Sequence, residues 1–298
     1  MVIGIFGGDK RMLFAARAFA EEGLSVCAAG FDQMVSLCGI RFCTTEEAAS
    51  RCDIAVLPVR PVTDGCLTAP FSTQKIGIPT LADALGMKPV FSGSASQLSP
   101  YVRGALYDYA AVEDFILKNA VLTAEGAIGI LLSDYEGAIR DCRILVTGYG
   151  RIGKVLSGYL HALGAQVSVA ARNLRDRKTA RDRGLFAEDY PQIDYGAYRV
   201  IINTVPALVL DRNALNAMRE DVFIIDLASL PGGVDDRAAR ERDLTCIHAL
   251  SLPGKTAPFT AGNIIKDTII KLLSDSKEEN GGKDKTGLCD DRLLLHLG

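Results

Sequence analysis

A glycine-rich turn at residues 148–153 has the residue types and the spacing of a phosphate-binding turn. It reads Gly148-Tyr149-Gly150-Arg151-Ile152-Gly153, after an apolar run at 143–147 and before a helical pattern at 152–163. The first glycine of such a turn permits the sharp bend, the second lets a diphosphate approach the backbone, and the third lets the helix pack on the strand. Free N–H groups at the helix N-terminus then favour phosphate. The turn therefore predicts a dinucleotide-binding site; a glycine turn that binds nothing is the alternative.

The end of the next predicted strand indicates which dinucleotide is bound. The run 167–171 ends in Ala171 and is followed by Arg172 and Asn173. Sites specific for NAD usually have Asp or Glu here, which binds the ribose 2′-hydroxyl. A carboxylate would repel the 2′-phosphate of NADP, whereas a guanidinium binds it through paired, charge-assisted hydrogen bonds. The sequence thus predicts NADP, with added positive charge nearby from Arg175, Arg177 and Lys178. For Arg177, Arg181 and Arg183 we favour a solvated helix face.

Two further turns follow predicted strands and are expected to belong to the same site. One consists of Asn203, Thr204, Val205 and Pro206, and the other of Leu227, Ala228 and Ser229. Ligands of open α/β sheets bind at the carboxyl ends of the strands, so both turns are expected to contact the cofactor, the first on its nicotinamide side. Ordinary joints between strand and loop are the alternative.

Strand-length apolar runs alternate with helical patterns along the whole chain. Predicted strands lie at 2–6, 25–29, 54–59, 89–92, 144–147, 166–170, 200–203, 222–227 and 246–249; a helix at 11–22 ends at Gly23, and a long apolar helix spans 123–135. This order predicts an α/β protein with two Rossmann-like, doubly wound parallel-sheet domains, joined by a long helix, with a cleft between them. We expect a substrate-side domain at 1–120 and an NADP-binding domain at 121–273. The last helix of that domain, at 261–273, should pack back on the first domain, before a polar, flexible tail at 274–298.

Composition excludes several other classes of protein. The net charge of −3 argues against nucleic-acid binding, which needs clustered Lys and Arg. Three His and eight Cys without a Cys-x-x-Cys pair predict no metal site and reduced, buried thiols. The first residues form a strand pattern without a basic segment, so we predict no signal peptide. No uninterrupted apolar run reaches the ~18 residues of a membrane helix.

Several motifs, taken in order, resemble the A-subunit family of dipicolinate synthase from about residue 2 to about residue 273. They are residues 6–9 (Phe-Gly-Gly-Asp), 30–33 (Gly-Phe-Asp-Gln), 57–59 (Leu-Pro-Val), 91–93 (Phe-Ser-Gly), 123–126 (Thr-Ala-Glu-Gly), 148–153, 203–206, 226–229 with 231–233, and 252–254 with 257–258. The resemblance implies an NADP-linked oxidoreductase in the cytoplasm of the mother cell of a sporulating bacterium. Its substrate would be a small cyclic dicarboxylate of the lysine pathway, a dihydro- or hydroxytetrahydro-dipicolinate, and its product pyridine-2,6-dicarboxylate. It also implies a partner, the flavoprotein-like B subunit of dipicolinate synthase; we further expect a homo-oligomer and no membrane association.

The substrate's two carboxylates require hydrogen-bond donors, which we expect at the strand ends of the first domain and in the loop 251–258. The candidates are Gly8, Thr63, Ser92, Gly93 and Lys255. Asp9 and Glu125 are candidate bases, although Asp9 has the sequence context of a helix N-cap and the loop 251–258 that of a rigid linker. Two alternatives stay open: an NADP-dependent Rossmann dehydrogenase of another small hydroxy or amino acid, and a non-catalytic NADP-binding regulatory subunit.

Overall fold

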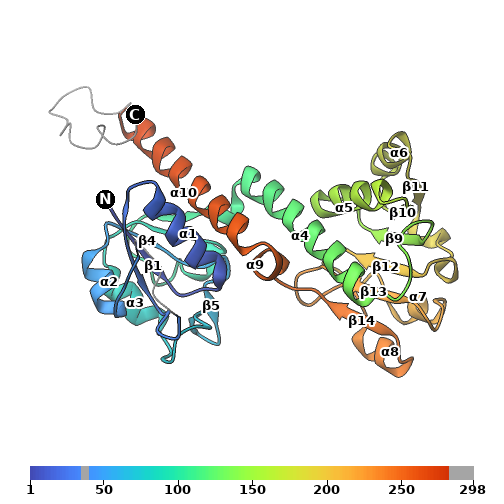
Figure 1. Cartoon of the computed structure of the whole chain (residues 1–298), viewed down its shortest axis with the longest axis horizontal. Helices are drawn as coiled ribbons and strands as arrows, with labels where there is room; N and C mark the ends of the chain where they lie inside the picture. Colours follow the sequence, from blue (N-terminus) through green and yellow to red (C-terminus); the bar gives the residue numbers. More distant parts are fainter. Residues whose placement is uncertain (35–39, 282–298) are drawn as a thin grey trace. The chain divides into compact units, whose positions relative to one another are not determined.

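The computed structural model describes residues 1–34 and 40–281, which form two units. The described residues of unit 1 lie within 1–8, 16–112 and 263–281, and unit 2 consists of Asp9–Ala15 and Glu113–Gly262. Each unit contains its own six-stranded parallel sheet (Figure 1). The predicted α/β fold with two parallel sheets is confirmed.

The sheet of unit 1 has the strand order of a Rossmann fold. Its order is β3-β2-β1-β4-β7-β8, with β1 at Val2–Phe6, β2 at Ser25–Ala29, β3 at Ile40–Phe42, β4 at Ile54–Val56, β7 at Val90–Ser92 and β8 at Leu106–Asp108. Figure 1 shows α1 (Lys10–Glu21) on one face and α2 (Thr45–Arg51) with α3 (Ile78–Leu85) on the other. A short hairpin, β5 (Val62–Thr63) and β6 (Cys66–Leu67), follows β4. The strand order reverses between β1 and β4, so their carboxyl ends mark the expected ligand position of this sheet.

The sheet of unit 2 repeats the same order. It is β11-β10-β9-β12-β13-β14, with β9 at Arg143–Thr147, β10 at Gln166–Ala170, β11 at Phe186–Glu188, β12 at Val200–Asn203, β13 at Phe223–Asp226 and β14 at Thr245–His248. The helices are α4 (Glu113–Asp134), α5 (Arg151–Ala162), α6 (Leu174–Asp182), α7 (Arg212–Asn216), α8 (Asp236–Glu241) and α9 (Leu252–Thr256). The final helix, α10 (Pro258–Gly281), is shared between the two units.

Side chains of the β9 strand alternate between two apolar cores. Ile144 and Val146 pack with residues of α4, α5 and α6, whereas Leu145 packs with residues of α7 and α8. Successive side chains of a strand point to opposite faces, and here both faces are covered by helices. This is why the strand sequences are continuous apolar runs.

Helix α4 is longer than the helix expected at 123–135. Its 22 residues have a mean hydropathy of 1.6 in their most apolar window, which meets the length and composition of a membrane span. Part of this apolar sequence is used inside the protein: Ala124, Ala127 and Leu131 belong to the core of unit 2, and Gly126 contacts Leu252 of α9. Burial therefore explains these apolar residues of α4, whereas Leu117 and Leu132 are exposed.

The C-terminal boundary and the loop 251–258 differ from expectation. Helix α10 continues to Gly281, past the predicted end at 273, and the remaining part of the predicted tail, 282–298, lies outside the described residues. Residues 251–258 form the short helix α9 and the start of α10, not an open loop.

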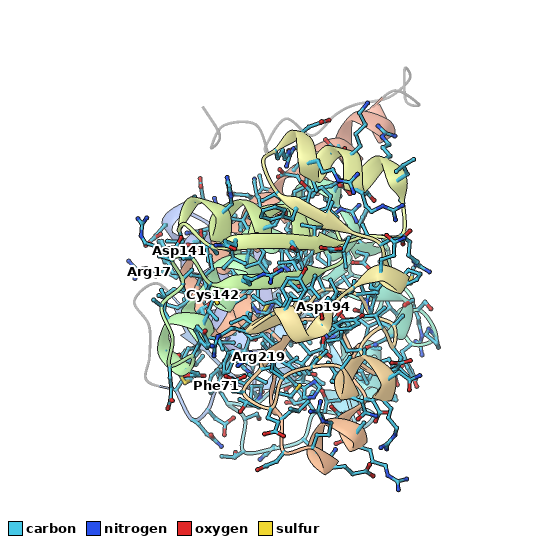
Figure 2. The ribbon with its side chains drawn as sticks, turned by 90° about the vertical axis from the view of Figure 1, so that its right-hand side faces the viewer. Arg17, Phe71, Asp141, Cys142, Asp194 and Arg219 are labelled. Carbon is cyan, nitrogen blue, oxygen red and sulfur yellow. The ribbon has the colours of Figure 1, made fainter. Side chains whose placement is uncertain are left out.

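The six described cysteines are free. The sulfur of Cys142, which is labelled in Figure 2, lies 3.5 Å from the Tyr135 hydroxyl. Burial raises the pKa of that hydroxyl to about 12.

Candidate dinucleotide-binding site

A cavity of about 530 Å³ lies at the carboxyl ends of the strands of unit 2. The turns after β9, β10 and β12 form three of its walls, and α4 forms the fourth. Eleven of its lining residues were predicted from the sequence: Gly148, Tyr149, Gly150, Arg151, Ile152, Ala171, Arg172, Asn173, Thr204, Val205 and Pro206. The remaining lining residues were not predicted: Ile116, Asn119, Ala120, Asp176 and Tyr190.

The three glycines of the turn are required for different reasons. Gly148 has a φ of +93° and donates its N–H to the Ala170 carbonyl at 2.8 Å. A Cβ added at Gly153 would lie 2.3 Å from the Gly148 carbonyl oxygen, so any side chain there would force the turn apart. Gly150 is different, because its backbone is extended and an added Cβ would meet nothing within 4 Å. The fold itself therefore does not require glycine at 150, whereas a phosphate resting on the backbone of this N-cap does. These residues fit a dinucleotide.

Tyr149 contributes an unusual buried group to the turn. The residue is 4% exposed, packs in the core of unit 2, and has the Lys154 ammonium 5.6 Å from its ring centre. Its hydroxyl is buried without a hydrogen-bond partner among the residues that the structure describes. A buried polar group without a partner carries the full cost of its lost hydration.

Tyr149→Phe is therefore expected to stabilise the protein. Removing the unpaired hydroxyl should raise the free energy of unfolding by about 1–2 kcal/mol, measured by urea denaturation. The matched control is Tyr198→Phe, because the buried Tyr198 hydroxyl does have a partner, Glu188 Oε1 at 3.3 Å. The control should be destabilised. A loss of stability in Tyr149→Phe would mean that its hydroxyl is satisfied in solution.

The cavity wall formed by the turn after β10 contains the residues predicted to determine the preference for NADP over NAD. Arg172 is exposed and lines the cavity, and Asn173 caps α6 by accepting the Arg175 N–H at 2.8 Å. Burial raises the pKa of the Tyr190 hydroxyl, and the positive charge of Arg172 acts in the opposite direction, so these two side chains are neighbours. Arg175 lies outside the lining. Asp176, an acid not anticipated from the sequence, lies within it.

The interpretation of Arg177 as part of a solvated helix face is wrong. Its side chain is only 13% exposed and pairs with Asp189 at 3.0 Å. Its Nη1 also donates to the carbonyl oxygens of Ala171 and Arg172, at 2.8 and 3.1 Å. Arg177 thus stabilises the backbone of the turn that contains Arg172, and its guanidinium group binds protein atoms instead of facing solvent.

Helix α4 supplies a wall that is far from the glycine turn in sequence. Ile116, Asn119 and Ala120 line the cavity from this helix. At its first residue, Glu113 accepts two hydrogen bonds from Arg151, at 3.0 and 2.6 Å, and these bonds lower the pKa of the Glu113 carboxyl. No local signal marks these α4 residues as lining, because only the packing of α4 on α5 brings them to the turn.

The turn after β12 is held by a buried polar network. Thr204 donates its hydroxyl to the Thr147 carbonyl at 2.8 Å. Asn203 is fully buried; it accepts from the Thr147 hydroxyl at 2.6 Å and from the Val205 N–H at 3.0 Å, and its amide donates to Asp226 at 2.8 Å. The structure therefore places Asn203 beside the cavity with its side chain committed to the protein. Gly153, Leu227, Ala228 and Ser229, also predicted to contact the cofactor, lie outside the lining.

Most predicted substrate donors of unit 1 already have partners within the protein. The Gly8 N–H donates to the Thr68 carbonyl at 2.7 Å, and the Thr63 and Thr68 hydroxyls lie 2.7 Å apart. The buried Ser92 hydroxyl donates to the carbonyl oxygens of Pro58 and Gly93, and the Gly93 N–H donates to Pro58 at 3.2 Å. The Gly8, Ser92 and Gly93 groups shape the carboxyl edge of the sheet and are not free donors. In the Thr63–Thr68 pair either hydroxyl can be the donor, so one of the two protons stays available.

The three predicted catalytic residues belong to different elements of unit 2. Asp9 caps the first turn of α1 and is gripped by Arg11, with Nε 2.9 Å from Oδ1 and Nη2 2.8 Å from Oδ2. A Cβ added at Gly254 of α9 would lie 2.6 Å from Asp9 Oδ2, so α9 packs directly on this pair. Glu125 on α4 and Lys255 on α9 are both exposed. Among the described residues, Asp9 is the one of the three whose side chain forms an ion pair.

Comparison with known proteins places the chain in a family. Its residues 2–105 match the family model for the N-terminal domain of the dipicolinate synthase A subunit. The solved structure of a transhydrogenase from Sinorhizobium meliloti shares the fold, at a TM-score of 0.71 and 14% identity over 93% of this chain and 95% of that one. The structure of the dipicolinate synthase A subunit from Bacillus halodurans is more similar, with a TM-score of 0.84 and 30% identity over 92% of this chain and 97% of that one. The dipicolinate synthase A subunit of Bacillus subtilis (strain 168) is 30% identical over 292 residues, which cover 94% of this chain and 98% of the relative. The chain therefore belongs to the A-subunit family of dipicolinate synthase.

Proposed function

We propose that the protein is an NADP-dependent oxidoreductase that forms pyridine-2,6-dicarboxylate from a dihydro- or hydroxytetrahydro-dipicolinate during sporulation. One observation supports NADP as the cofactor. A single cavity of unit 2 is lined both by Gly150, an N-cap glycine with open space around it, and by Arg172, whose guanidinium group is exposed. The name that its relatives share, dipicolinate synthase, supports the product.

The proposed reaction aromatises the substrate ring. A dihydro-dipicolinate loses a hydride from one ring carbon and a proton from another ring atom; a hydroxytetrahydro substrate must lose one water as well. NADP, when bound, supplies the acceptor for the hydride. The chain's own residues bind the diphosphate at the N-terminus of α5 and the 2′-phosphate at Arg172, while Thr204, Val205 and Pro206 exclude water from one wall. Asp9 and Glu125 stay our proposed proton acceptors; Asp9 must loosen its ion pair with Arg11 to accept a proton.

Two exposed cations, one in each unit, are our alternative proposed ligands for a carboxylate of the substrate. Lys255 lies on α9 of unit 2. Arg60 lies in the loop that follows β4 of unit 1. The carboxyl end of β4 is one of the two strand ends at which the strand order of this sheet reverses, where ligands of such sheets bind. Its loop is fixed on both sides, since the Pro58 carbonyl accepts the Gly93 N–H and the Pro61 carbonyl accepts the Thr68 N–H at 2.8 Å. In the part of the chain that the structure describes, Arg60 has no anionic partner, so its guanidinium is available to a carboxylate.

Arg60→Ala is expected to raise the KM for the dicarboxylate by about tenfold or more, the value of one charge-assisted hydrogen-bond pair. The Kd for NADP should stay unchanged, because Arg60 does not line the cavity of unit 2. Arg41→Ala is the matched control, an exposed arginine on the edge strand β3 without an ion pair among the described residues. Lys255→Ala is measured in the same way. Unchanged substrate kinetics would remove the tested residue from the substrate site.

The test of the function is direct formation of product. The purified protein is mixed with the lysine-pathway intermediate and either NADP or NAD, and ultraviolet absorbance follows pyridine-2,6-dicarboxylate formation with and without the B subunit. We expect product with NADP. NADP binding without turnover in either arm would favour a regulatory role, and oxidation of another hydroxy or amino acid would favour a different dehydrogenase.

The same proposal includes the setting of the reaction. The relatives are named as subunits, which supports a complex. We propose a flavoprotein-like B subunit as the partner and the cytoplasm of the mother cell as the setting. Co-purification with the B subunit from sporulating cells tests the complex.

A further inference from the structure

We infer that Asp226 is a positioning residue that fixes the cavity wall formed by Thr204, Val205 and Pro206. Asp226 is the last residue of β13 and is 1% exposed. Its Oδ1 accepts the Asn203 amide at 2.8 Å and the Ala228 N–H at 3.0 Å, and its Oδ2 accepts the Gly233 N–H at 2.9 Å. One carboxylate therefore connects the last residue of β12 to the segment that follows β13.

Asn203 transmits this constraint to the cavity wall. With its amide nitrogen held by Asp226, the Asn203 side chain is left in one orientation. In that orientation its oxygen accepts the Val205 N–H and its nitrogen donates to the Val205 carbonyl, each at 3.0 Å. Both backbone groups of a residue that lines the cavity are thereby fixed by a side chain that does not touch it. If Asp226 becomes an amide, its NH2 group must face at least one of the three N–H donors that the carboxylate now accepts, so that two donors oppose each other.

Hydrogen bonds from Asn203 and from two backbone N–H groups hold the Asp226 carboxylate at this position. Burial of a charge is costly, and no Lys or Arg pairs with Asp226 within residues 1–34 and 40–281. The Nδ1 of the His248 imidazole lies 3.7 Å from Asp226 Oδ2, and its Nε2 lies 2.6 Å from Asp236 Oδ1. The packing is also tight. A Cβ at Gly232 would lie 2.8 Å from Asp226 Oδ2, and a Cβ at Gly233 would lie 2.2 Å from Asn203 Nδ2. The segment is built around the Asn203–Asp226 pair.

This inference rests on the proposal that the cavity binds NADP, so its test uses cofactor binding without substrate. Calorimetry gives the Kd for NADPH of the full-length protein and its variants. Asp226→Asn should weaken binding about tenfold, the value of one hydrogen bond to a charged group. Asp235→Ala is the matched control, because Asp235 caps α8 by accepting the Ala238 N–H and does not line the cavity. It should lower the melting temperature but change the Kd by less than about twofold.

A second variant gives a signature that general destabilisation does not produce. Asn203→Asp brings two carboxyl groups together, and one of them is expected to take up a proton as the pH falls, which restores a donor between them. Relative to wild type at the same pH, its binding should be weak near pH 8 and should recover toward about pH 6, whereas Asp226→Asn should show no recovery. The titratable groups beside this pair are His248, which lies 3.7 Å from Asp226 and contacts Asp236, and Cys246, whose thiol pKa is raised by burial and by the charge of Asp226. These groups are unchanged in all variants.

The outcomes separate the two proposals. If the wild-type protein binds neither NADPH nor NADH, the proposed function fails. If wild type binds NADPH and Asp226→Asn binds it equally well, or if Asn203→Asp shows no dependence on pH, Asp226 does not position the cavity wall.

Discussion

Replacing Arg172 with aspartate is expected to reverse the cofactor preference of this protein from NADP to NAD. The Arg172 side chain is exposed, lines the cavity and lies at the strand end where the ribose of the cofactor is expected. Loss of a charge-assisted interaction with the 2′-phosphate costs about 1.5–3 kcal/mol, and the new carboxylate adds repulsion. The same carboxylate can accept a hydrogen bond from the 2′-hydroxyl of NAD. Together these effects should change the ratio of the two Kd values by about a hundredfold or more.

The experiment compares Kd values for NADPH and NADH by calorimetry, for wild type, Arg172→Asp and two controls. Arg175→Ala tests a residue that was predicted from the sequence but lies outside the lining, and Arg183→Ala tests an exposed arginine at the C-cap of the same helix. Both controls should bind NADPH within about twofold of wild type, apart from weak long-range effects that salt screens. A wild-type protein that prefers NADH, or an Arg172→Asp variant that keeps its preference for NADPH, would contradict the assignment. Asp176 would then be the residue to examine, because it is the carboxylate in the same wall.

Features of the site that depend on neighbours in sequence were predictable. The glycine turn, Arg172 and the turn at 204–206 each follow a strand, and a parallel sheet brings the ends of its strands to one edge. The three-residue strands β3, β8 and β11 were not predicted, because each contains a charged residue and carries little apolar pattern, whereas β4 and β7, of the same length, contain none.

Features that depend on remote partners were not predictable. Asn119 lines the cavity because α4 packs on α5. Tyr190 lines it because the fold places this side chain beside Arg172. Ser92 and Gly8 have the residue types and positions of substrate donors, but their partners, Pro58 and Thr68, are distant in sequence. Arg177 was misjudged for the same reason, since the carbonyls and the carboxylate that it binds are brought to it by the fold. A pattern of residue types indicates which groups are present, and the fold decides which of them are already satisfied.

The second large effect is expected at Gly150, where the requirement for glycine comes from the ligand and not from the fold. Its φ of −77° suits any residue, and an added Cβ would meet nothing within 4 Å. Serine is a preferred N-cap residue, so Gly150→Ser should leave the free energy of unfolding unchanged or slightly raised. The new side chain nevertheless enters the space in which a diphosphate would rest on the N-terminus of α5. Forcing atoms into such a contact costs about 1–3 kcal/mol, so the Kd for NADPH should rise about 10- to 100-fold.

Two glycines of the same helix give opposite controls for this prediction. Gly153→Ala should lower stability, because its Cβ would lie 2.3 Å from the Gly148 carbonyl, and any loss of cofactor binding would accompany that loss of stability. Gly158 lies exposed within α5 with open space around it, so Gly158→Ala should stabilise the helix by about 0.5–1 kcal/mol and leave the Kd unchanged. Urea denaturation and calorimetry on the three variants therefore separate a glycine needed by the ligand, one needed by the turn and one needed by neither. If Gly150→Ser binds NADPH as tightly as wild type, no diphosphate rests on this N-terminus, and the cavity does not bind a dinucleotide in the manner proposed.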